Sequence, residues 1–256
     1  MALNKYMHPR NKYRNKKANF QHLAIKYPEF RKHVFPDVSG KLFLDFQNPE
    51  SLRQLSITLM KEDFGLDVEL PPDRLVPTIP LRLNYILWIE DILNNSKANG
   101  EIRGIDIGTG GSCVYPLLSN SLNKWSFLAT ELKYCSLDVK QTSSKSINLI
   151  IKIFVVFFSV KKVQESAILL DVIGDGADTY DFCMCNPPFF SDHLEAQGIT
   201  NSRSDQRPEP HSVNTASSTE SVAFGGEVEF VTFLITVVHF FVHFFKVIIC
   251  SVLEPL

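Results

Sequence analysis

The chain has 256 residues, of which 45% are hydrophobic, and this is enough for one large domain, or one domain with an extension, around a substantial core. Its five cysteines are an odd number without the spacing of a zinc knuckle, which argues against a disulfide framework and gives no indication of a metal site. From this cysteine pattern we expect reduced thiols in an intracellular protein. The net charge of −2 hides a basic N-terminus, and because no apolar segment follows it we expect no secretory signal.

The first seventeen residues form a basic arm, because no aspartate or glutamate occurs before Glu29. Tyr6, Tyr13 and Phe20 are interleaved with the positive charges, a pattern that favours contact with nucleic acid over an ordinary solvated tail. We therefore predict that the cations of this arm bind phosphates: Lys5, Arg10, Lys12, Arg14, Lys16 and Lys17.

A small subdomain is predicted to follow the arm. Helical spacing of apolar residues predicts a helix from Phe20 to Tyr27, and the alternation over Lys41 to Phe46 predicts a short strand. Asn48 is placed to cap a further helix that has Pro49 in its first turn. The arm and this subdomain together give a first region, residues 1–79.

The segment Leu81 to Leu93 reads as an amphipathic helix after a proline-rich connection. Arg82 lies in its first turn, where a cation is unfavourable for the helix dipole. This indicates another partner, such as a carboxylate, although a surface arginine is an equally simple interpretation.

A cofactor site is predicted where two strands end. The strand Ile102 to Ile107 leads into the glycine turn Asp106 to Ser112, and the strand Trp125 to Thr130 ends at Glu131. Glycines allow a ligand to approach the backbone, and an acid at this separation can accept both hydroxyls of a ribose. We therefore expect a nucleoside-bearing cofactor over these strand ends, with Ser112 near its amino-acid or phosphate end; for Glu131 the alternative is a surface carboxylate.

The run Tyr180 to Cys185 has the apolarity of a strand buried on both faces, and Asn186, Pro187, Pro188 and Phe189 follow it directly. Two prolines leave rigid, unpaired carbonyls that can accept from the two N–H groups of an adenine amine. The asparagine adds another acceptor, and Phe189 offers a face on which a flipped base can stack. A plain Pro-Pro turn at the end of a strand is the alternative.

Two further segments leave alternatives open. The polar stretch Ser191 to Gly226 contains Arg203 and Arg207, and it is predicted either to grip a nucleic-acid backbone or to be disordered. The apolar run Val228 to Leu253 is long enough to span a bilayer, but its histidines and Lys246 raise the cost of insertion, so we rank a membrane anchor last.

With the Asn186–Phe189 segment, the glycine turn, Arg82 and Glu131 in place, the chain resembles the methyltransferase-like protein 16 family. These are S-adenosylmethionine-dependent N6-adenosine methyltransferases of U6 spliceosomal RNA and of hairpins in the methionine adenosyltransferase transcript. The resemblance is close over residues 1–131 and again over 180–230. It implies a class I methyltransferase with a Rossmann-like, doubly wound sheet, a structured RNA as partner, no DNA, a monomer, and a location in the nucleus and cytoplasm.

The resemblance also implies roles for particular residues. Arg82 would hold the methionine carboxylate, and Asn186 to Phe189 would clamp and stack the target adenine. Around the rest of the cofactor the implied residues are Gly108 and Ser112 at the methionine moiety, Glu131 at the ribose, and Ala167, which stands where the family has the threonine of a Lys-Thr pair.

Two stretches depart from the family, residues 132–163 and 231–256, so the methyltransferase domain is assigned to 80–230 and the chain is interpreted as truncated or mispredicted. The last family strands would then be missing, and the strand Tyr180 to Cys185 would be an exposed edge of the sheet. The alternative function is therefore a catalytically inactive RNA-binding fragment.

Overall fold

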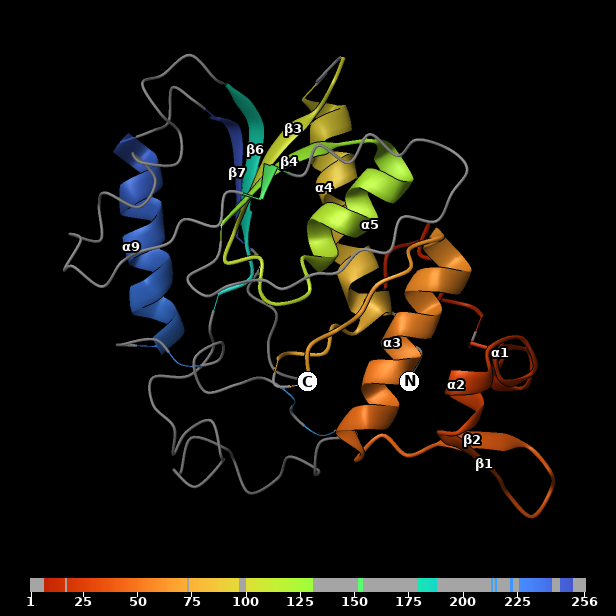
Figure 1. Ribbon diagram of the computed structural model, residues 1–256. Coiled ribbons are helices and arrows are strands. Elements are labelled where there is room, and N and C mark those ends of the chain that lie inside the picture. Colours follow the sequence, from red (N-terminus) through yellow and green to blue (C-terminus); the bar gives the residue numbers. More distant parts are fainter. Residues whose placement is uncertain are drawn as a thin grey trace.

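The computed structural model describes residues 7–16, 18–72, 74–96, 100–130, 152–153, 179–187, 213, 215, 222, 226–240 and 245–250. Within this part of the chain, an N-terminal group of helices with a hairpin packs beside a parallel sheet (Figure 1). The predicted residues outside the described ranges include Lys5, Lys17, Glu131, Ala167, Pro188, Phe189, Arg203 and Arg207.

The N-terminal subdomain begins with two short helices. α1 spans Phe20–Lys26 and ends at Tyr27, as predicted, because Pro28 follows and starts α2, Pro28–Arg31. An antiparallel hairpin comes next, formed by β1, Val34–Pro36, and β2, Leu42–Leu44, which lies inside the predicted strand.

α3 spans Pro49–Phe64, and its two ends have the expected chemistry. The Asn48 side chain accepts hydrogen bonds from the backbone N–H groups of Glu50 and Ser51 at 2.9 and 3.2 Å, which confirms the predicted cap. At the other end Gly65 adopts a left-handed conformation, with φ of 67°, and closes the helix. The subdomain core is therefore built on a helix whose limits the local sequence determines.

The five-stranded sheet is parallel throughout and has the order β5-β4-β3-β6-β7. Its strands are β3 (Arg103–Ile107), β4 (Ser126–Thr130), β5 (Lys152–Ile153), β6 (Tyr180–Cys185) and β7 (Phe245–Cys250). From β3 the chain moves outward to β4 and β5, and then returns to place β6 on the other side of β3. This reversal between two central strands is the switch point of a doubly wound fold.

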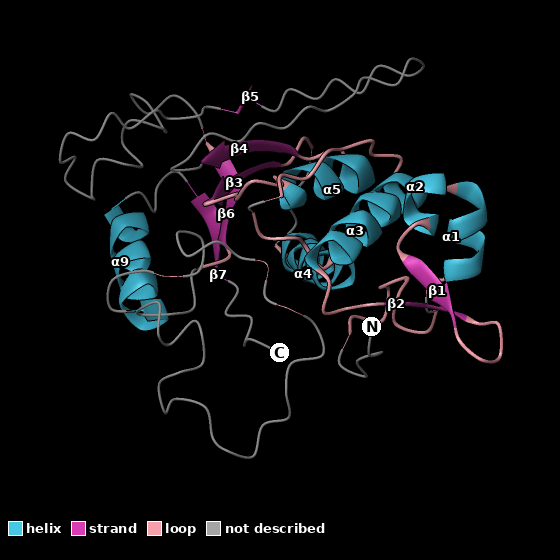
Figure 2. Ribbon diagram, turned by 60° about the horizontal axis from the view of Figure 1, so that its bottom comes forward, coloured by secondary structure: helices cyan, strands magenta, loops and turns pink. Residues whose placement is uncertain are grey.

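Helices lie on both sides of this sheet, as the doubly wound prediction requires. α4 (Ile79–Asn95) and α5 (Val114–Asn123) lie on the side of the N-terminal subdomain, whereas α9 (Gly226–Phe240) lies on the other side (Figures 1 and 2). Among the residues that the structure describes, no helix combines the length and the apolar character needed to cross a membrane.

The expectation that β6 forms the edge of the sheet was wrong. β7 pairs with β6 in parallel, with Cys185 opposite Cys250, so the strand that leads to Asn186 has a neighbour on each side. The reason is physical, because Phe245–Cys250 is rich in β-branched and aromatic residues, which favour strands. Such a run can pair as a parallel strand even though its sequence does not resemble the family.

Phe182, on β6, lies at the centre of the packing between the sheet and its helices. Its ring is fully buried and meets the rings of Trp125 and Phe127 edge-on, with centroids 5.4 and 5.5 Å away. Gly104 on β3 lies against the same ring, and a Cβ atom there would be 2.5 Å from the ring carbon Cζ. The absence of a side chain at position 104 therefore allows β3 and β6 to lie side by side.

Candidate active site

The predicted site residues meet at the switch point of the sheet. β3 and β6 are paired with Ile107 opposite Cys185, so Gly108 and Asn186, the next residues along each strand, leave the same edge. Ligands of open α/β sheets bind at the carboxyl ends of the strands, at the point where the order reverses. Two motifs separated widely in sequence are thus adjacent because of the topology.

The glycine turn is fixed to the end of β4. Gly108 and Gly110 both have φ of 69°, in the left-handed region where glycine is favoured. The backbone N–H of Thr109 donates to the Thr130 carbonyl at 2.9 Å, and that of Gly108 donates to the Thr130 hydroxyl at 3.3 Å. Ser112 is buried in the same turn before α5. The glycine turn is therefore held in place at the carboxyl ends of β3 and β4.

Arg82 comes from the first turn of α4 and reaches the start of α5 and the residue that follows β6. Its Nη1 donates to the Tyr115 hydroxyl at 2.7 Å and to Asn186 Oδ1 at 3.2 Å. The sequence indicated a partner such as a carboxylate, but both of these partners are neutral. The guanidinium therefore keeps its positive charge available for an anionic ligand.

The remaining donors at the site fit a carboxylate-bearing cofactor. Arg82 Nε is buried and has no hydrogen-bond partner among the described residues, and the same holds for the Thr109 hydroxyl. A buried polar group without a partner costs about 1–3 kcal/mol, so both atoms favour a ligand that supplies the missing hydrogen bonds. The residues present at the switch point therefore suit the methionine end of the expected cofactor.

Asn186 is half-buried and Pro187 is buried, directly after a strand whose six residues are all buried. β6 is anchored at its other end, where the Asp181 carboxylate accepts from the Arg103 backbone N–H at 2.8 Å. The asparagine is thus held by a strand that is fixed along its length. Pro188 and Phe189 lie outside the described residues, so stacking of a base on Phe189 stays a prediction.

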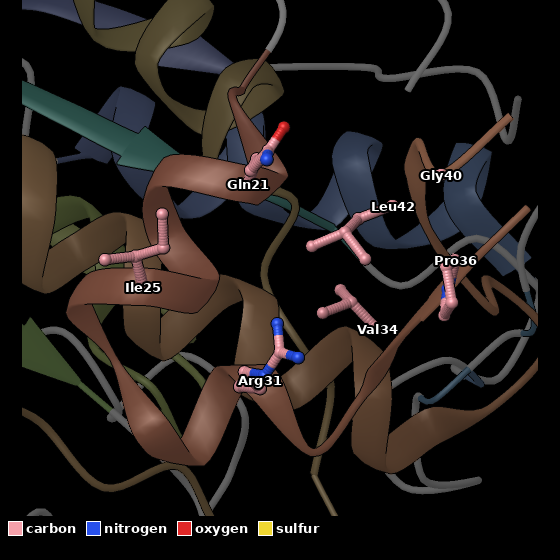
Figure 3. Close-up of a pocket in the computed structure, with 7 residues that line it drawn as sticks. All are labelled: Gln21, Ile25, Arg31, Val34, Pro36, Gly40 and Leu42. Atoms are coloured by element: carbon pink, nitrogen blue, oxygen red, sulfur yellow. The ribbon is translucent and has the colours of Figure 1, made fainter.

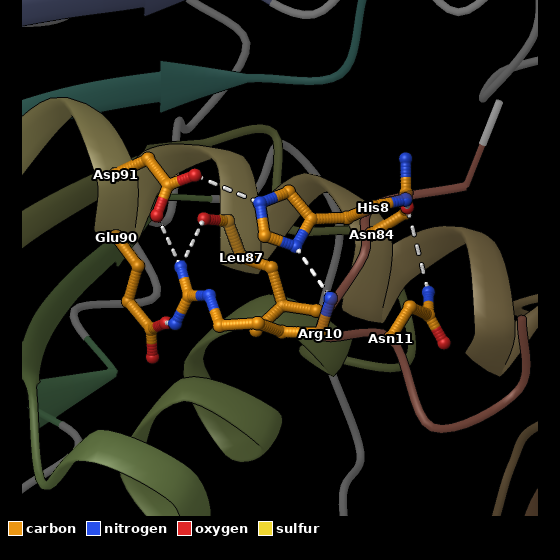
Figure 4. Close-up of polar contacts among 7 residues, drawn as sticks. All are labelled: His8, Arg10, Asn11, Asn84, Leu87, Glu90 and Asp91. Atoms are coloured by element: carbon orange, nitrogen blue, oxygen red, sulfur yellow. Dashed lines mark hydrogen bonds and ion pairs between the residues drawn. The ribbon is translucent and has the colours of Figure 1, made fainter.

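The basic arm is tied to α4, and this use of its charges was not foreseen. The Arg10 guanidinium forms ion pairs with Glu90 and Asp91 and donates to the Leu87 carbonyl at 3.3 Å (Figure 4). His8 contacts Asp91 at 2.8 Å. The hydrogen bond from His8 and the charge of Arg10 hold the pKa of Asp91 below its ordinary value.

The other described cations of the arm divide into two groups. Lys12 pairs with Asp63 at 2.6 Å, whereas Arg14 and Lys16 form no ion pair with any residue in the described ranges. Arg14 is half-buried and Lys16 is exposed. The second group is therefore better placed than Arg10 or Lys12 to receive a phosphate.

The loop after Asn186 is attached to the N-terminal half at two described points. The Thr215 hydroxyl accepts from the Val76 backbone N–H at 2.8 Å, and the Val213 N–H donates to the Phe46 carbonyl at 3.1 Å. These contacts join the loop to the proline-rich connection and to the subdomain. No local sequence pattern announces such long-range backbone contacts.

A pocket of about 320 Å³ lies apart from the switch point, between α1 and the hairpin of the N-terminal subdomain (Figure 3). It contains none of the predicted site residues. Its lining consists of Gln21, Ile25, Arg31, Val34, Pro36, Gly40 and Leu42.

Comparisons with known proteins agree with this geometry. A family model described as RNA methyltransferase matches residues 1–251. The RNA N(6)-adenosine-methyltransferase mettl16 of Danio rerio is 50% identical over 90% of this chain and 47% of its own length. The U6 small nuclear RNA (adenine-(43)-N(6))-methyltransferase of Caenorhabditis elegans is 42% identical over 92% of this chain and 51% of its own length.

Solved structures give the same result. The human METTL16 catalytic domain in complex with MAT2A 3′UTR hairpin 1 superimposes with a TM-score of 0.73 at 47% identity, over 90% of this chain and 76% of that one. The N-terminal domain of human METTL16 in complex with SAH gives a TM-score of 0.65 at 38% identity, over 95% of this chain and 82% of that one.

These matches also show the fold, which is that of the class I methyltransferases. The chain spans about half the length of the curated relatives that it matches. Because the family model covers nearly the whole chain, the protein belongs to the METTL16 family of RNA methyltransferases.

Proposed function

We propose that the chain transfers a methyl group from S-adenosylmethionine to the N6 atom of an adenosine in structured RNA. One observation carries the proposal: Arg82, suited to a carboxylate, contacts Asn186, suited to an amine, at the switch point. A methyl-transfer site needs these two functions next to each other. Further support comes from relatives named for methylation of U6 small nuclear RNA and from a structural neighbour bound to a MAT2A hairpin.

The cofactor would be held by residues from the first turn of α4 and from the ends of β3 and β4. Arg82 would hold the methionine carboxylate, Gly108 and Ser112 would line the methionine moiety, and Glu131 would accept hydrogen bonds from the ribose hydroxyls. The cofactor supplies an electrophilic methyl group on its sulfonium. The residues of the chain would orient the adenosine amine toward this methyl group.

The amine would be oriented by acceptors on the residues that directly follow β6. Pro187 has a fixed φ and supplies no N–H, so the carbonyls of Asn186 and Pro187 would serve as rigid acceptors, and Asn186 would add its side-chain oxygen. An amide oxygen has two lone pairs, so Asn186 Oδ1 can accept from Arg82 and from the substrate at once. Because the amine loses its proton late, orientation matters more than a strong base at this site.

The RNA backbone would be bound beside the site by the arm and by the loop that follows the clamp. Arg14 and Lys16 are the described cations suited to phosphates, and Arg203 and Arg207 extend the predicted surface along the loop. Neutralised phosphates release counterions, so RNA affinity should fall as salt rises. A structured RNA of the U6 or hairpin type is the expected partner, in the nucleus and cytoplasm.

Calorimetry with S-adenosylhomocysteine on the purified chain, followed by methyl transfer to a U6-like hairpin, tests this function. We expect saturable binding and RNA-dependent turnover. Asn186→Ala should lower turnover by about 100-fold, since it misplaces the reacting nitrogen. The control Asn94→Ala removes an exposed asparagine at the far end of α4 and should leave both measurements unchanged.

A soluble, folded chain that binds the hairpin but not the cofactor would contradict the enzymatic proposal. It would favour the second candidate, an RNA-binding protein without methyltransferase activity. Turnover that survives Asn186→Ala at the wild-type rate would instead refute the assignment of the clamp.

A further inference from the structure

Tyr115 contacts Arg82 through both its hydroxyl group and its aromatic ring. It lies at the start of α5, and its side chain is almost wholly buried, with 3% of its surface exposed. Its hydroxyl accepts the Arg82 hydrogen bond at 2.7 Å, and the guanidinium carbon lies 5.4 Å from the centre of its ring. The same tyrosine therefore holds the cation at its polar end and over its aromatic face.

The ring of Tyr115 is itself fixed from behind. Tyr85, one helical turn after Arg82 on α4, packs edge-on against it with centroids 5.4 Å apart and planes at 81°. Tyr85 in turn stacks on Trp88 with centroids 6.0 Å apart. An aromatic ladder thus supports the residue that touches Arg82, and the phenol has little freedom to turn away.

The protonation of Tyr115 matters for the charge at the site. Burial raises the pKa of its phenol, against the opposing effect of Arg82, so the group stays neutral at physiological pH. A neutral phenol orients the guanidinium without cancelling its charge. A carboxylate in the same place would hold Arg82 equally well but would compete with the carboxylate of the ligand.

We propose that Tyr115 is a positioning residue for methyl transfer: it aims Arg82 at the cofactor carboxylate and, through Arg82, fixes the side-chain oxygen of Asn186. This inference rests on the proposed function, since it assigns a partner to the cation of that same site. An arginine has many side-chain rotamers, so an arginine fixed before binding loses less conformational entropy on taking up its ligand. Tyr115 acts only through Arg82, and it touches no reacting atom.

Tyr115→Phe keeps the ring and its packing and removes only the hydroxyl. We expect about tenfold weaker binding of S-adenosylhomocysteine and a KM for S-adenosylmethionine raised by a similar factor, as the loss of one hydrogen bond to a charged group predicts. The kcat should fall less than the affinity, because β6 still holds the backbone of Asn186 and Tyr115 acts on the asparagine oxygen only indirectly, through Arg82. The matched control Tyr27→Phe removes a hydroxyl that donates to Glu62 at 2.7 Å in the N-terminal subdomain, and it should not change affinity.

A double-mutant cycle separates positioning from general support of the fold. In an Arg82→Ala background the hydroxyl has no cation to orient, so Tyr115→Phe should change the cofactor affinity by less than about twofold. A merely structural tyrosine would weaken binding by the same factor in both backgrounds, and that result would overturn the proposal.

A cofactor-free readout is available from the Arg82 side chain. Its Nε–H is buried, so its proton–nitrogen NMR signal, assigned by its loss in Arg82→Ala, should be observable in the unliganded protein. Tyr115→Phe should shift or broaden this signal, whereas Tyr27→Phe should leave it unchanged. An unchanged signal in Tyr115→Phe would refute the positioning role.

The two proposals fail in distinguishable ways. A wild-type chain that neither binds cofactor nor methylates RNA contradicts the proposed function, while the NMR comparison still decides whether Tyr115 orients Arg82. A wild-type chain that is active, with Tyr115→Phe indistinguishable from Tyr27→Phe, leaves the function intact and removes only this inference.

Discussion

Substitution of Gly104 by alanine should push apart the two strands that carry the site. The added Cβ would lie 2.5, 2.8 and 2.9 Å from three carbons of the Phe182 ring. Carbon atoms in contact prefer about 3.5–4.0 Å, so the ring or the strand must shift by about 1 Å. The ring cannot do so easily, because it is fully buried between Trp125 and Phe127.

The cost follows from this crowding. Overpacking a well-packed core costs about 1–3 kcal/mol, and the constrained ring places Gly104→Ala near the upper end. Alanine recovers about 0.5–1 kcal/mol of backbone entropy relative to glycine in a strand. The free energy of unfolding should therefore fall by about 2 kcal/mol, which lowers the thermal midpoint by roughly 4–8 °C in a chain of this size.

Urea unfolding followed by circular dichroism measures this loss, with Phe182→Leu as the second substitution. In the Phe182→Leu background the methyl group added at position 104 has room, so Gly104→Ala should cost less than about 0.5 kcal/mol there. A wild-type stability for Gly104→Ala, or an equal loss in both backgrounds, would refute the packing argument. The same variant should also weaken cofactor binding, since β3 and β6 carry Gly108 and Asn186.

Two further predictions concern the N-terminal subdomain. Asn48→Ala removes the cap of α3 and should lower the free energy of unfolding by about 1 kcal/mol, measured by urea unfolding. The hydrogen bond from Lys26, and after it the hydrogen bond from Tyr27, lowers the pKa of Glu62 to about 2 from an ordinary 4.5. The Glu62 carboxylate therefore stabilises the fold above pH 4.5, and this contribution is lost as the pH falls toward 2. Unfolding midpoints across that range should fall less steeply in Glu62→Gln than in the wild type, and equal slopes in the two proteins would contradict this assignment.

The elements that carry the site could be predicted because their signals are local. A strand buried on both faces is a short apolar run, and this pattern located β6 with its observed limits, Tyr180–Cys185. The glycine turn after β3 is predictable because its glycines tolerate a left-handed backbone conformation. Because both motifs follow strands directly, the general rule for parallel sheets was enough to expect them at one edge.

The partners of Arg82 could not be predicted, for a physical reason. Tyr115 and Asn186 follow it by 33 and 104 positions, and no periodicity links residues so far apart. The dipole argument correctly indicated that a cation in the first turn of α4 needs a partner. It could not distinguish a carboxylate from a phenol, because both accept a hydrogen bond from a guanidinium.

The partner strand of β6 was missed because composition was given more weight than pairing. A run dominated by Phe, Val and Ile resembles a membrane segment when hydropathy alone is considered. The same residues favour a buried parallel strand, and Lys246 within the run suits a strand better than a bilayer. An unpaired β6 would expose a row of backbone groups, so any suitable apolar run nearby gains by pairing with it.

α4 connects the basic arm to the candidate active site, because residues of the same helix contact both. Asn84, Leu87 and Asp91 are spaced three and four residues apart, so they form one stripe of the helix, and His8 and Arg10 of the arm bind along it. Arg82 precedes Asn84 by two positions, about 200° around the helix, and therefore points away from the arm toward the site. The helix is held on one face by the arm and on the other by Tyr115 and Asn186. Arg10, which was predicted solely as a phosphate ligand, thus helps to fix the element that presents Arg82, so its removal should weaken cofactor binding.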